Sequence, residues 1–492
     1  MTVATTSSPT GPAGGGVQDR GGQLEPGSFR DRDSRVVMRE GEVLRALSSL
    51  ALADWERLSA SKTWQRFSAD GRLVATEQVA DPGPVLAELA DVAGSGGQPW
   101  VALLRHETIP FVSYPYEWCF SMLRDAAALH LELLSAALSE DMILKDATPF
   151  NVQFVGTRPV FIDVPSFIEL KPGEVWVGYR QFCELFLYPL MLMAYKGVPF
   201  HSWLRGSLEG LSPLEFRGLM SWRDWFRKGV LVHVVLHAAL GEQHKDDDVD
   251  MRKQIKQAGF KKEMIAINLR KLTKLIGRLQ WRSKASTWSD YAGDCHYDAE
   301  RREAKRAFVS AVASARPRKL VWDLGCNTGE YSRLAAEHAE RVVAMDGDHL
   351  AIERLYIALK AEGEERILPL VINLAAPSPG LGWAGKERQA LSDRGQPELI
   401  LALALMHHMI IACHIPLDDW IDWLASLGGD LVLEWVGKGD PMVKKLLLNK
   451  DDRYADYTQE NLEQALGRHW RIAAQEELAG GTRVLYHATR DV

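Results

Sequence analysis

The feature that most constrains this chain is a strand, a glycine loop and a helix in direct succession. Residues 320–322 are apolar and end at Asp323, the loop 325–329 (GCNTG) follows, and a helical pattern begins after it. This order opens a βαβ unit and is typical of parallel sheets. The strand delivers its loop to the carboxyl edge of the sheet, where α/β proteins bind ligands. Glycines let that backbone approach a ligand closely.

The spacing of this loop narrows the choice of ligand. The dinucleotide fingerprint is G-x-G-x-x-G, whereas the loop here reads G-x-x-x-G and is preceded by an acid two residues before its first glycine. A second strand-like run, 341–345, ends at Asp346. An acid at the end of a second strand can accept both ribose hydroxyls. The pattern therefore indicates a ribose-bearing ligand at this edge.

The chain from residue 288 onward alternates strands and helices. Predicted strands cover 319–323, 341–346, 367–372, 398–404 and 430–436, followed by an antiparallel hairpin of 470–477 and 482–490. Predicted helices cover 298–315, 349–361 and 417–427. We expect an α/β fold with a seven-stranded Rossmann-like sheet, made of five parallel units and a terminal β-hairpin. The loop 375–397 is rich in Pro and Gly and is expected near the substrate mouth.

The loop, the two acids and the strand order together resemble the class I S-adenosylmethionine (SAM) methyltransferases. The resemblance extends to a bacterial two-part family that includes nodulation-protein-like methyltransferases. In that family a front segment like LKDATPFNVQF…PVFIDVPSF precedes a WDLGCNTG loop, as it does here. The resemblance implies a methyltransferase with S-adenosyl-L-methionine as its cofactor.

The resemblance also implies roles for individual residues. Asp323 would face the methionyl ammonium, directly or through water, and Asp346 would bind the ribose hydroxyls. Asn373 would recognise the adenine amino group, and Leu403 would line the cofactor beside the fourth strand. The full set of implied cofactor contacts is Asp323, Gly325, Cys326, Asn327, Gly329, Asp346, Asn373 and Leu403.

Methyl transfer from a sulfonium asks mainly for positioning of the acceptor and exclusion of water. A base is needed only where the acceptor must lose a proton. Two candidates lie at the sheet edge: His407, which follows the fourth strand, and Glu434, which is embedded in the fifth and could equally be structural. No metal ligand is predicted.

A second informative stretch lies in the front half. Asp146, Asn151 and Asp163 have the spacing of the catalytic loop of the protein-kinase and aminoglycoside-phosphotransferase superfamily, which they resemble. The chain departs from that pattern, because Leu-Lys precedes Asp146 and Val-Pro follows Asp163. Three interpretations stay open: a structural loop held by side-chain-to-backbone bonds, a degenerate kinase-like domain, and an active phosphotransferase.

Three further features each carry a plain structural alternative. His233 and His237 lie one turn apart, a spacing that can bind metal, although packed core histidines are favoured. The basic face of 266–285 could bind an acidic partner or RNA, although a packed linker helix is favoured. Aromatic residues that could form either a lid or core contacts precede the first strand: Trp288, Tyr291 and Tyr297.

Length and composition set the remaining expectations. The chain of 492 residues is too long for one ordinary core. The predicted division is a disordered tail 1–24, an α+β and possibly degenerate kinase-like domain 25–243, a charged linker and helix 244–287, and a methyltransferase domain 288–492. Five scattered cysteines without C-x-x-C spacing indicate a reducing compartment, and we expect a cytoplasmic protein.

The partner expected is a small-molecule or carrier-bound methyl acceptor. A net charge of -7 disfavours nucleic acid, and the longest apolar stretch, 185–195, is too short for a membrane span, so no membrane partner is expected. Two alternatives remain: a bifunctional protein with an ATP- and magnesium-using front half, and a non-catalytic SAM-binding module. The acceptor and the oligomeric state are left open.

Overall fold

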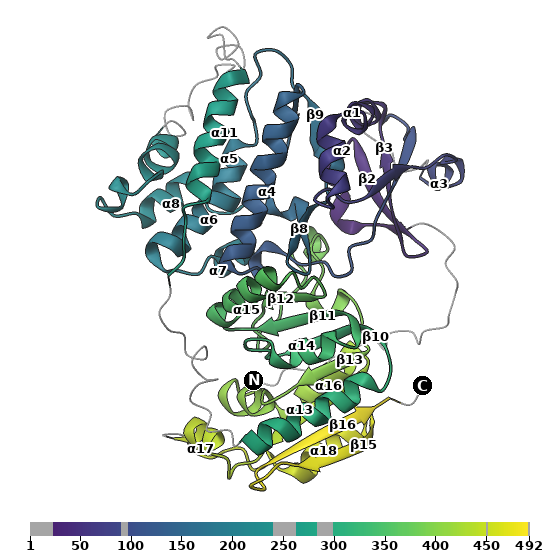
Figure 1. Cartoon of the computed structure of the whole chain (residues 1–492), viewed down its shortest axis with the longest axis vertical. Helices are drawn as coiled ribbons and strands as arrows, with labels where there is room; N and C mark the ends of the chain where they lie inside the picture. The colour runs from purple at the N-terminus through teal and green to yellow at the C-terminus, as the bar shows by residue number, and fades with distance from the viewer. Residues whose placement is uncertain (1–22, 90–96, 240–261, 283–298, 449–450, 491–492) are drawn as a thin grey trace, which may run out of the picture. The chain divides into compact units, whose positions relative to one another are not determined.

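The computed structural model describes residues 23–89, 97–239, 262–282, 299–448 and 451–490 (Figure 1). The chain forms two compact units, one reaching to Leu52 and including Thr76–Thr108, the other made of Ala53–Ala75 and everything from Ile109. Part of the predicted front domain thus belongs to the same unit as the predicted methyltransferase domain. The predicted boundaries at 243/244 and 287/288, and nearly all of the predicted tail, lie outside the described residues. The domain division stays a prediction.

The first unit is built on an antiparallel five-stranded sheet with the order β1-β2-β3-β5-β4. Its strands are β1 Gln23–Leu24, β2 Ser34–Arg39, β3 Glu42–Leu47, β4 Thr76–Gln78 and β5 Ala102–His106, with helix α3 Gly83–Glu88. Strands β2 and β3 form a hairpin. Its turn residues, Glu40 and Gly41, both have positive φ. Val37, Leu44 and Leu103 are buried in its core.

The second unit begins with a helical region, and residues 109–239 and 262–282 are called the front part below. Helix α1 (Ser49–Ser59) begins in the first unit and ends in the second. The other helices of this region are α2 Lys62–Ala69, α4 Phe120–Ser139, α5 Tyr179–Phe182, α6 Tyr188–Met191, α7 His201–Gly206, α8 Pro213–Leu219 and α11 Lys262–Ile276. The apolar stripe of α4 is buried, and Leu123, Leu131 and Leu134 are all fully covered. Helix α11 packs along α4 (Figure 1) and buries Leu269 and Leu272, as a packed linker helix would.

Two short antiparallel pairs follow α4 in the front part. Strand β6 (Met142–Leu144) pairs with β9 (Phe167–Glu169), and β7 (Val152–Val155) pairs with β8 (Arg158–Phe161). Strands β7 and β8 form a hairpin between Asn151 and Asp163. The kinase-like nature of the front half stays a prediction.

The second unit also contains the predicted seven-stranded sheet, which is confirmed. Its strands are β10 Arg318–Leu324, β11 Ala339–Asp346, β12 Ile367–Val371, β13 Leu399–Ala402, β14 Asp430–Val436, β15 Arg471–Glu477 and β16 Arg483–Thr489. Their order is β12-β11-β10-β13-β14-β16-β15. The first five pair in parallel, and β16 runs antiparallel to β14 and β15. Residues 299–448 and 451–490 are called the sheet part.

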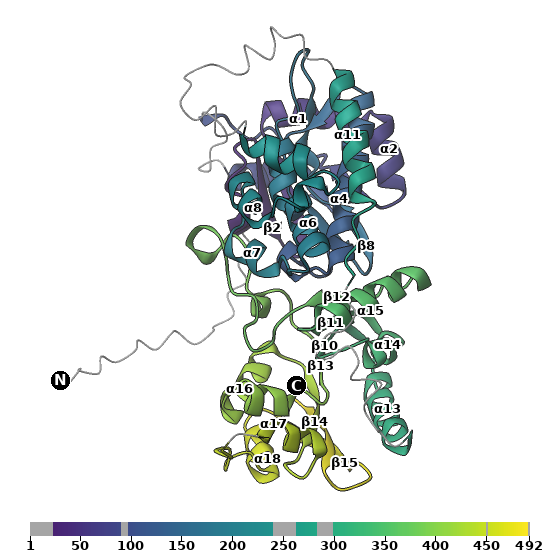
Figure 2. The same ribbon diagram turned by 90° about the vertical axis from the view of Figure 1, so that its left-hand side faces the viewer.

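Helices cover both faces of this sheet, as a parallel sheet requires. Figure 2 shows α13 (Ala299–Ser314), α14 (Glu330–Ala336) and α15 (His349–Glu362) on one side. Helices α16 (Leu417–Leu427) and α18 (Gln459–Gly467) lie on the other. Side chains cap two of the helices: Thr458 accepts from the Asn461 amide at the start of α18, and Asp440 accepts from the Met442 amide at the start of α17 (Pro441–Leu447). No helix among the described residues is long and apolar enough to cross a bilayer.

One crossover in the sheet lacks an α-helix. The connection from β12 to β13 contains only short 3-10 turns, at Trp383–Gly385 and Leu391–Asp393. The front part packs on the sheet instead: Phe111 stands edge-on to Trp322 of β10 with ring centroids 5.9 Å apart. Phe111 also lines a small cavity together with Val343 and Leu368 of the neighbouring strands.

Helix α15 is joined to α4 by buried polar contacts. The Glu353 carboxylate accepts hydrogen bonds from the Ser121 amide at 2.9 Å and the Ser121 hydroxyl at 2.5 Å, at the start of α4. One turn further along, the Tyr356 hydroxyl donates to Asp125 at 2.7 Å. A carboxylate at a helix N-terminus is favourable because unpaired amides and the helix dipole meet it there. The front part and the sheet part therefore share one interior.

Candidate functional site

The glycine loop after β10 is folded as its sequence suggests. Gly325, Asn327 and Gly329 all have positive φ, which turns the chain sharply between β10 and α14. A Cβ on Gly329 would come within 2.6 Å of Leu355 in α15, so glycine is needed there for packing as well as for its φ. Cys326 is buried, and burial raises the pKa of its thiol well above the ordinary value, so the thiol stays protonated.

The carboxylate of Asp346, at the end of β11, ties this loop to the next one. It accepts hydrogen bonds from the Asn327 amide and the Asp348 amide, each at 2.8 Å. Burial raises the pKa of Asp346, while these amides act in the opposite direction. The Gly347 amide also lowers the pKa of Asp346, so a ligand would share a carboxylate that already accepts from several amides of the chain. The structure thus brings together two of the predicted cofactor contacts, Asp346 and Asn327.

Asp323 lies at the carboxyl end of β10 and is 2% exposed. Its carboxylate accepts a hydrogen bond from the Ser332 hydroxyl at 2.5 Å. Burial raises its pKa to about 6, against smaller lowering by Ser332 and by the ammonium of Lys305. A buried carboxylate with a raised pKa is poised to gain from a cation placed beside it.

The other two predicted contacts lie at the ends of the neighbouring strands. Asn373 follows β12 and is exposed, and its side-chain oxygen already accepts the Ala375 amide at 3.0 Å. The end of β12 meets the end of β11, because the Ile372 amide donates to the Asp346 carbonyl at 2.9 Å. Leu403 follows β13 and is buried. All of these predicted cofactor residues therefore follow the carboxyl ends of adjacent parallel strands.

His407 lies in the segment after β13 and is 1% exposed. Neither of its ring nitrogens has a hydrogen-bond partner within the described residues, and its ring centroid is 4.1 Å from that of His408. Burial lowers the pKa of His407 well below the ordinary value, with further lowering by His408, Arg483 and Lys305. The ring is therefore neutral near pH 7, which is the form that can accept a proton.

Glu434 in β14 is fully buried and paired with two cations. Lys305 of α13 lies at 2.5 Å and Arg483 of β16 at 2.9 Å from its carboxylate oxygens, and Arg483 also binds Asp440 at 2.7 Å. Burial alone would raise the pKa of Glu434, but the two cations lower it. The sequence did not point to Lys305 or Arg483, since neither lies in a recognisable motif.

The front-half candidates are partly brought together. The side-chain amide of Asn151 donates to the Asp163 carboxylate at 3.3 Å, and the backbone amide of Asp146 donates to the Ser166 hydroxyl at 3.4 Å. His233 and His237 meet tyrosine hydroxyls, at 2.7 Å from Tyr179 and 2.9 Å from Tyr188 respectively, as expected of packed histidines. The kinase-like role of the loop stays a prediction. The aromatic residues 288, 291 and 297 lie outside the described residues.

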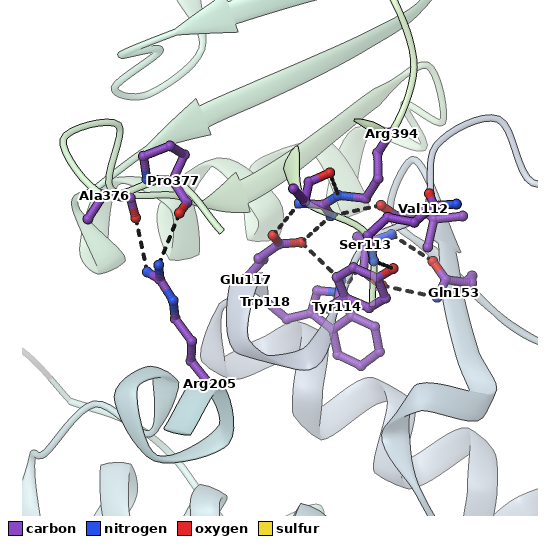
Figure 3. A network of polar contacts seen from close by, with 12 residues as sticks. Val112, Ser113, Tyr114, Glu117, Trp118, Gln153, Arg205, Ala376, Pro377 and Arg394 are labelled. Carbon is purple, nitrogen blue, oxygen red and sulfur yellow. Dashed lines mark hydrogen bonds and ion pairs between the residues drawn. The ribbon is translucent and has the colours of Figure 1, made fainter. Parts of the chain in front are cut away.

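A buried ion pair joins the front part to the β12–β13 connection (Figure 3). Arg394 meets the Glu117 carboxylate through two nitrogens, at 2.6 and 2.7 Å, and also donates to the Val112 carbonyl at 3.0 Å. The side chains are 0% and 1% exposed. Burial alone would lower the pKa of Arg394, but Glu117 raises it. No sequence motif marks this pair, whose members lie 277 positions apart.

The same connection is held at two further points. The guanidinium of Arg388 lies 4.4 Å from the ring centroid of Phe150, and the Gln389 amide donates to the Tyr114 hydroxyl at 2.8 Å. Near the start of the connection, Arg205 of α7 donates to the carbonyls of Ala376 and Pro377, each at 3.0 Å (Figure 3). The loop expected at the substrate mouth is thus fixed by side chains from the front part.

The chain is similar to one curated protein along almost its whole length. It is 35% identical over 467 residues to nodulation protein NoeA of Rhizobium meliloti (strain 1021), and the match covers 94% of each chain. A scan against protein-family models found no match.

Solved structures are similar to part of the chain. N-methyltransferase NodS of Bradyrhizobium japonicum WM9 is 14% identical, with 39% of this chain and 98% of that chain covered and a TM-score of 0.29. Magnesium protoporphyrin IX methyltransferase of Synechocystis PCC 6803, with bound S-adenosylhomocysteine, is 19% identical, with 42% and 92% covered and a TM-score of 0.30. At these TM-scores the fold assignment depends on the strand order described above.

Removing the Glu117 charge should destabilise the chain strongly. Glu117→Gln leaves the Arg394 guanidinium buried without its carboxylate, and breaking a buried pair in this way costs about 3–5 kcal/mol. The measurement is the midpoint of urea unfolding. Asp451→Asn, which neutralises an ion pair with Arg453 whose side chains are 85% and 84% exposed, is the matched control and should leave the midpoint unchanged. Equal, small shifts in both variants would contradict the importance of the buried pair.

Proposed function

The chain belongs to the family of nodulation protein NoeA, and from this premise we propose that it is a SAM-dependent methyltransferase. The acceptor we propose is a small molecule or a carrier-bound one. The sheet order supports the proposal, because five parallel strands with an antiparallel last hairpin form the class I methyltransferase sheet. The alternative of a non-catalytic SAM-binding module would share the cofactor site and lack only the transfer.

The observation that carries the proposal is the hydrogen bond from the Asn327 amide to the Asp346 carboxylate. It joins the glycine loop after β10 to the acid that ends β11, at the edge where open α/β sheets bind their ligands. The carboxylate of Asp346 would accept hydrogen bonds from the ribose hydroxyls of an adenosine. A carboxylate acceptor for a hydroxyl pair, beside a loop without bulky side chains, is the site that such a cofactor needs.

The other residues fit the same ligand. Gly325 and Gly329 keep side chains out of the bend, and a Cβ on Gly325 would already be 3.3 Å from Leu405. The buried carboxylate of Asp323 would face the methionyl ammonium, directly or through water. Asn373 and Leu403, which follow the adjacent strands, would contact the adenine and the cofactor face. We propose each of these residue roles independently of the others.

The bound sulfonium would supply an activated methyl group, so the chain's own contribution is mainly positional. The segment after β13 is shielded from water, because Leu403, Met406 and His407 are all buried. His407 is the group we propose as proton acceptor, because its neutral ring has two nitrogens without partners among the described residues. Its pKa lies well below the ordinary value, so the ring is a weak base and would take a proton only from an acidic group of the methyl acceptor.

Glu434 is the weaker candidate for a base. Lys305 and Arg483 stabilise its ionised form, so it has little tendency to take up a proton. Its contacts join α13, β14 and β16, which suits a structural role. Glu434 stays a predicted base, although its two ion pairs disfavour that role.

The front part would help to select the acceptor. The connection 375–397, expected at the substrate mouth, is held by Glu117, Tyr114 and Arg205 of the front part. A loop fixed at several points presents a defined wall to an acceptor, whereas a free loop would not. A net charge of -7 gives no broad attraction for nucleic acid, in keeping with a small or carrier-bound acceptor.

Calorimetry with S-adenosylhomocysteine tests the cofactor assignment. Asp346→Ala should weaken binding at least about tenfold, since a hydrogen bond to a charged group contributes about 1.5–3 kcal/mol. Asp418→Ala, at an exposed carboxylate on α16 that pairs with Arg468, is the control and should bind like the unaltered chain. Equal affinity in both variants would remove the ribose role of Asp346, and no binding by the unaltered chain would remove the proposed function. Transfer of labelled methyl from SAM to any acceptor would exclude the non-catalytic alternative.

Cofactor affinity should depend on pH through Asp323. Its folded pKa, about 6, lies above the ordinary value, so its contribution to stability is present at low pH and is lost as the pH rises through about 6. A bound ammonium favours the carboxylate, so binding releases a proton and strengthens as the pH rises. Between pH 7.5 and 5 we expect calorimetry to show about tenfold weaker binding of S-adenosylhomocysteine. Asp323→Asn should flatten this change, and an identical pH profile in the variant would contradict the assignment.

A further inference from the structure

Helix α7 lies against both loops that would hold the adenosine end of the cofactor. Those loops follow β11, where Asp346 ends the strand, and β12, where Asn373 follows it. They are neighbours, since the Ile372 amide donates to the Asp346 carbonyl at 2.9 Å and a Cβ on Gly347 would be 3.9 Å from Asn373. Helix α7 belongs to the front part, so its presence at this edge is not a feature of the sheet itself.

Arg205 fixes the loop after β12. Its two terminal nitrogens donate separately to the carbonyls of Ala376 and Pro377, each at 3.0 Å (Figure 3). The Ala376 amide in turn donates to the Asn373 carbonyl at 3.0 Å. Arg205 therefore holds the end of the turn that begins at Asn373 and sets the direction of its side chain. A planar fork that binds two carbonyls at once restrains orientation better than a single donor does.

His201 fixes the loop after β11. Its ring centroid lies 4.1 Å from that of His349, the first residue of α15 and the third after Asp346. Its Nε2 lies 2.8 Å from the Trp118 carbonyl, an acceptor, so Nε2 carries the proton and Nδ1 is a bare acceptor. Nδ1 of His201 and Nδ1 of His349 are both buried without a hydrogen-bond partner among the described residues. Buried ring nitrogens are usually hydrogen-bonded, so two without a partner, at the start of the helix that follows Asp346, set this contact apart from apolar packing.

We propose that α7 positions the adenosine end of the cofactor pocket, with Arg205 and His201 as its positioning residues. This inference rests on the proposed SAM site and deepens it, because it makes that site the joint product of the front part and the sheet part. Arg205 acts through the Asn373 turn and His201 acts through His349. The front part thereby controls cofactor affinity as well as the shape of the loop 375–397, which is expected near the methyl acceptor.

The proposal is tested by comparing two ligands that share only the adenosine end. S-adenosylhomocysteine carries the amino-acid end, and 5′-methylthioadenosine lacks it. Arg205→Ala in the full chain should weaken both ligands by the same factor, about tenfold, because the adenosine loops are disturbed. Arg205→Lys keeps the charge and loses the fork. Its affinity for each ligand should lie between that of Arg205→Ala and that of the unaltered chain. Asp323→Asn should weaken S-adenosylhomocysteine and leave 5′-methylthioadenosine unchanged.

Arg270→Ala is the matched control, because Arg270 is exposed on α11 and donates to the Ala266 carbonyl of its own helix. It should leave both affinities unchanged. A fall in melting temperature for Arg205→Ala with both affinities intact would show a purely structural role and overturn the proposal. Weakening of S-adenosylhomocysteine alone would overturn the adenosine assignment. Failure of the unaltered chain to bind either ligand would remove the proposed function instead, so the two failures are distinguishable.

Discussion

The structure depends on the rule that a parallel sheet must be covered on both of its faces. In this chain the crossover between β12 and β13 supplies no α-helix, and side chains of the front part, Phe111 above all, pack on the sheet. Removing the front part would therefore expose apolar sheet surface. It would also remove the Glu117 carboxylate and the Val112 carbonyl, to which Arg394 donates. The two halves are thus physically interdependent, whatever reactions each carries out.

Because of this interdependence, residues of both parts hold the loops at the functional edge of the sheet. The loops that follow β10 and β11 are joined by the Asp346 carboxylate, within the sheet part alone. The loop that follows β12 is fixed from outside, by Arg205 near its start and by Glu117 near its end. A site made in this way holds its ligand-binding groups in place before a ligand arrives, which lowers the entropy lost on binding.

The sheet could be predicted from the sequence because its determinants are local. Apolar runs bounded by glycine, acids and turns located β10 and β11 to within two residues, and the helix α16 at its observed bounds. The predicted ligand loop and Asp346 also lie together, since the carboxyl ends of neighbouring parallel strands must meet. The contacts made by the front part could not be predicted. Periodicity shows which face of an element is buried and does not show what covers it, so the Glu117–Arg394 pair had no local signal.

Hydrogen exchange of the full chain, followed by mass spectrometry with and without S-adenosylhomocysteine, tests the central claim most directly. The claim is that one ligand site is built by the sheet part and completed by the front part. We predict slower exchange in residues 324–330 and 346–350, and also in 201–206, which lie far away in the sequence. Protection confined to the sheet part would contradict the joint site, and no protection in 324–330 and 346–350 would contradict the site itself.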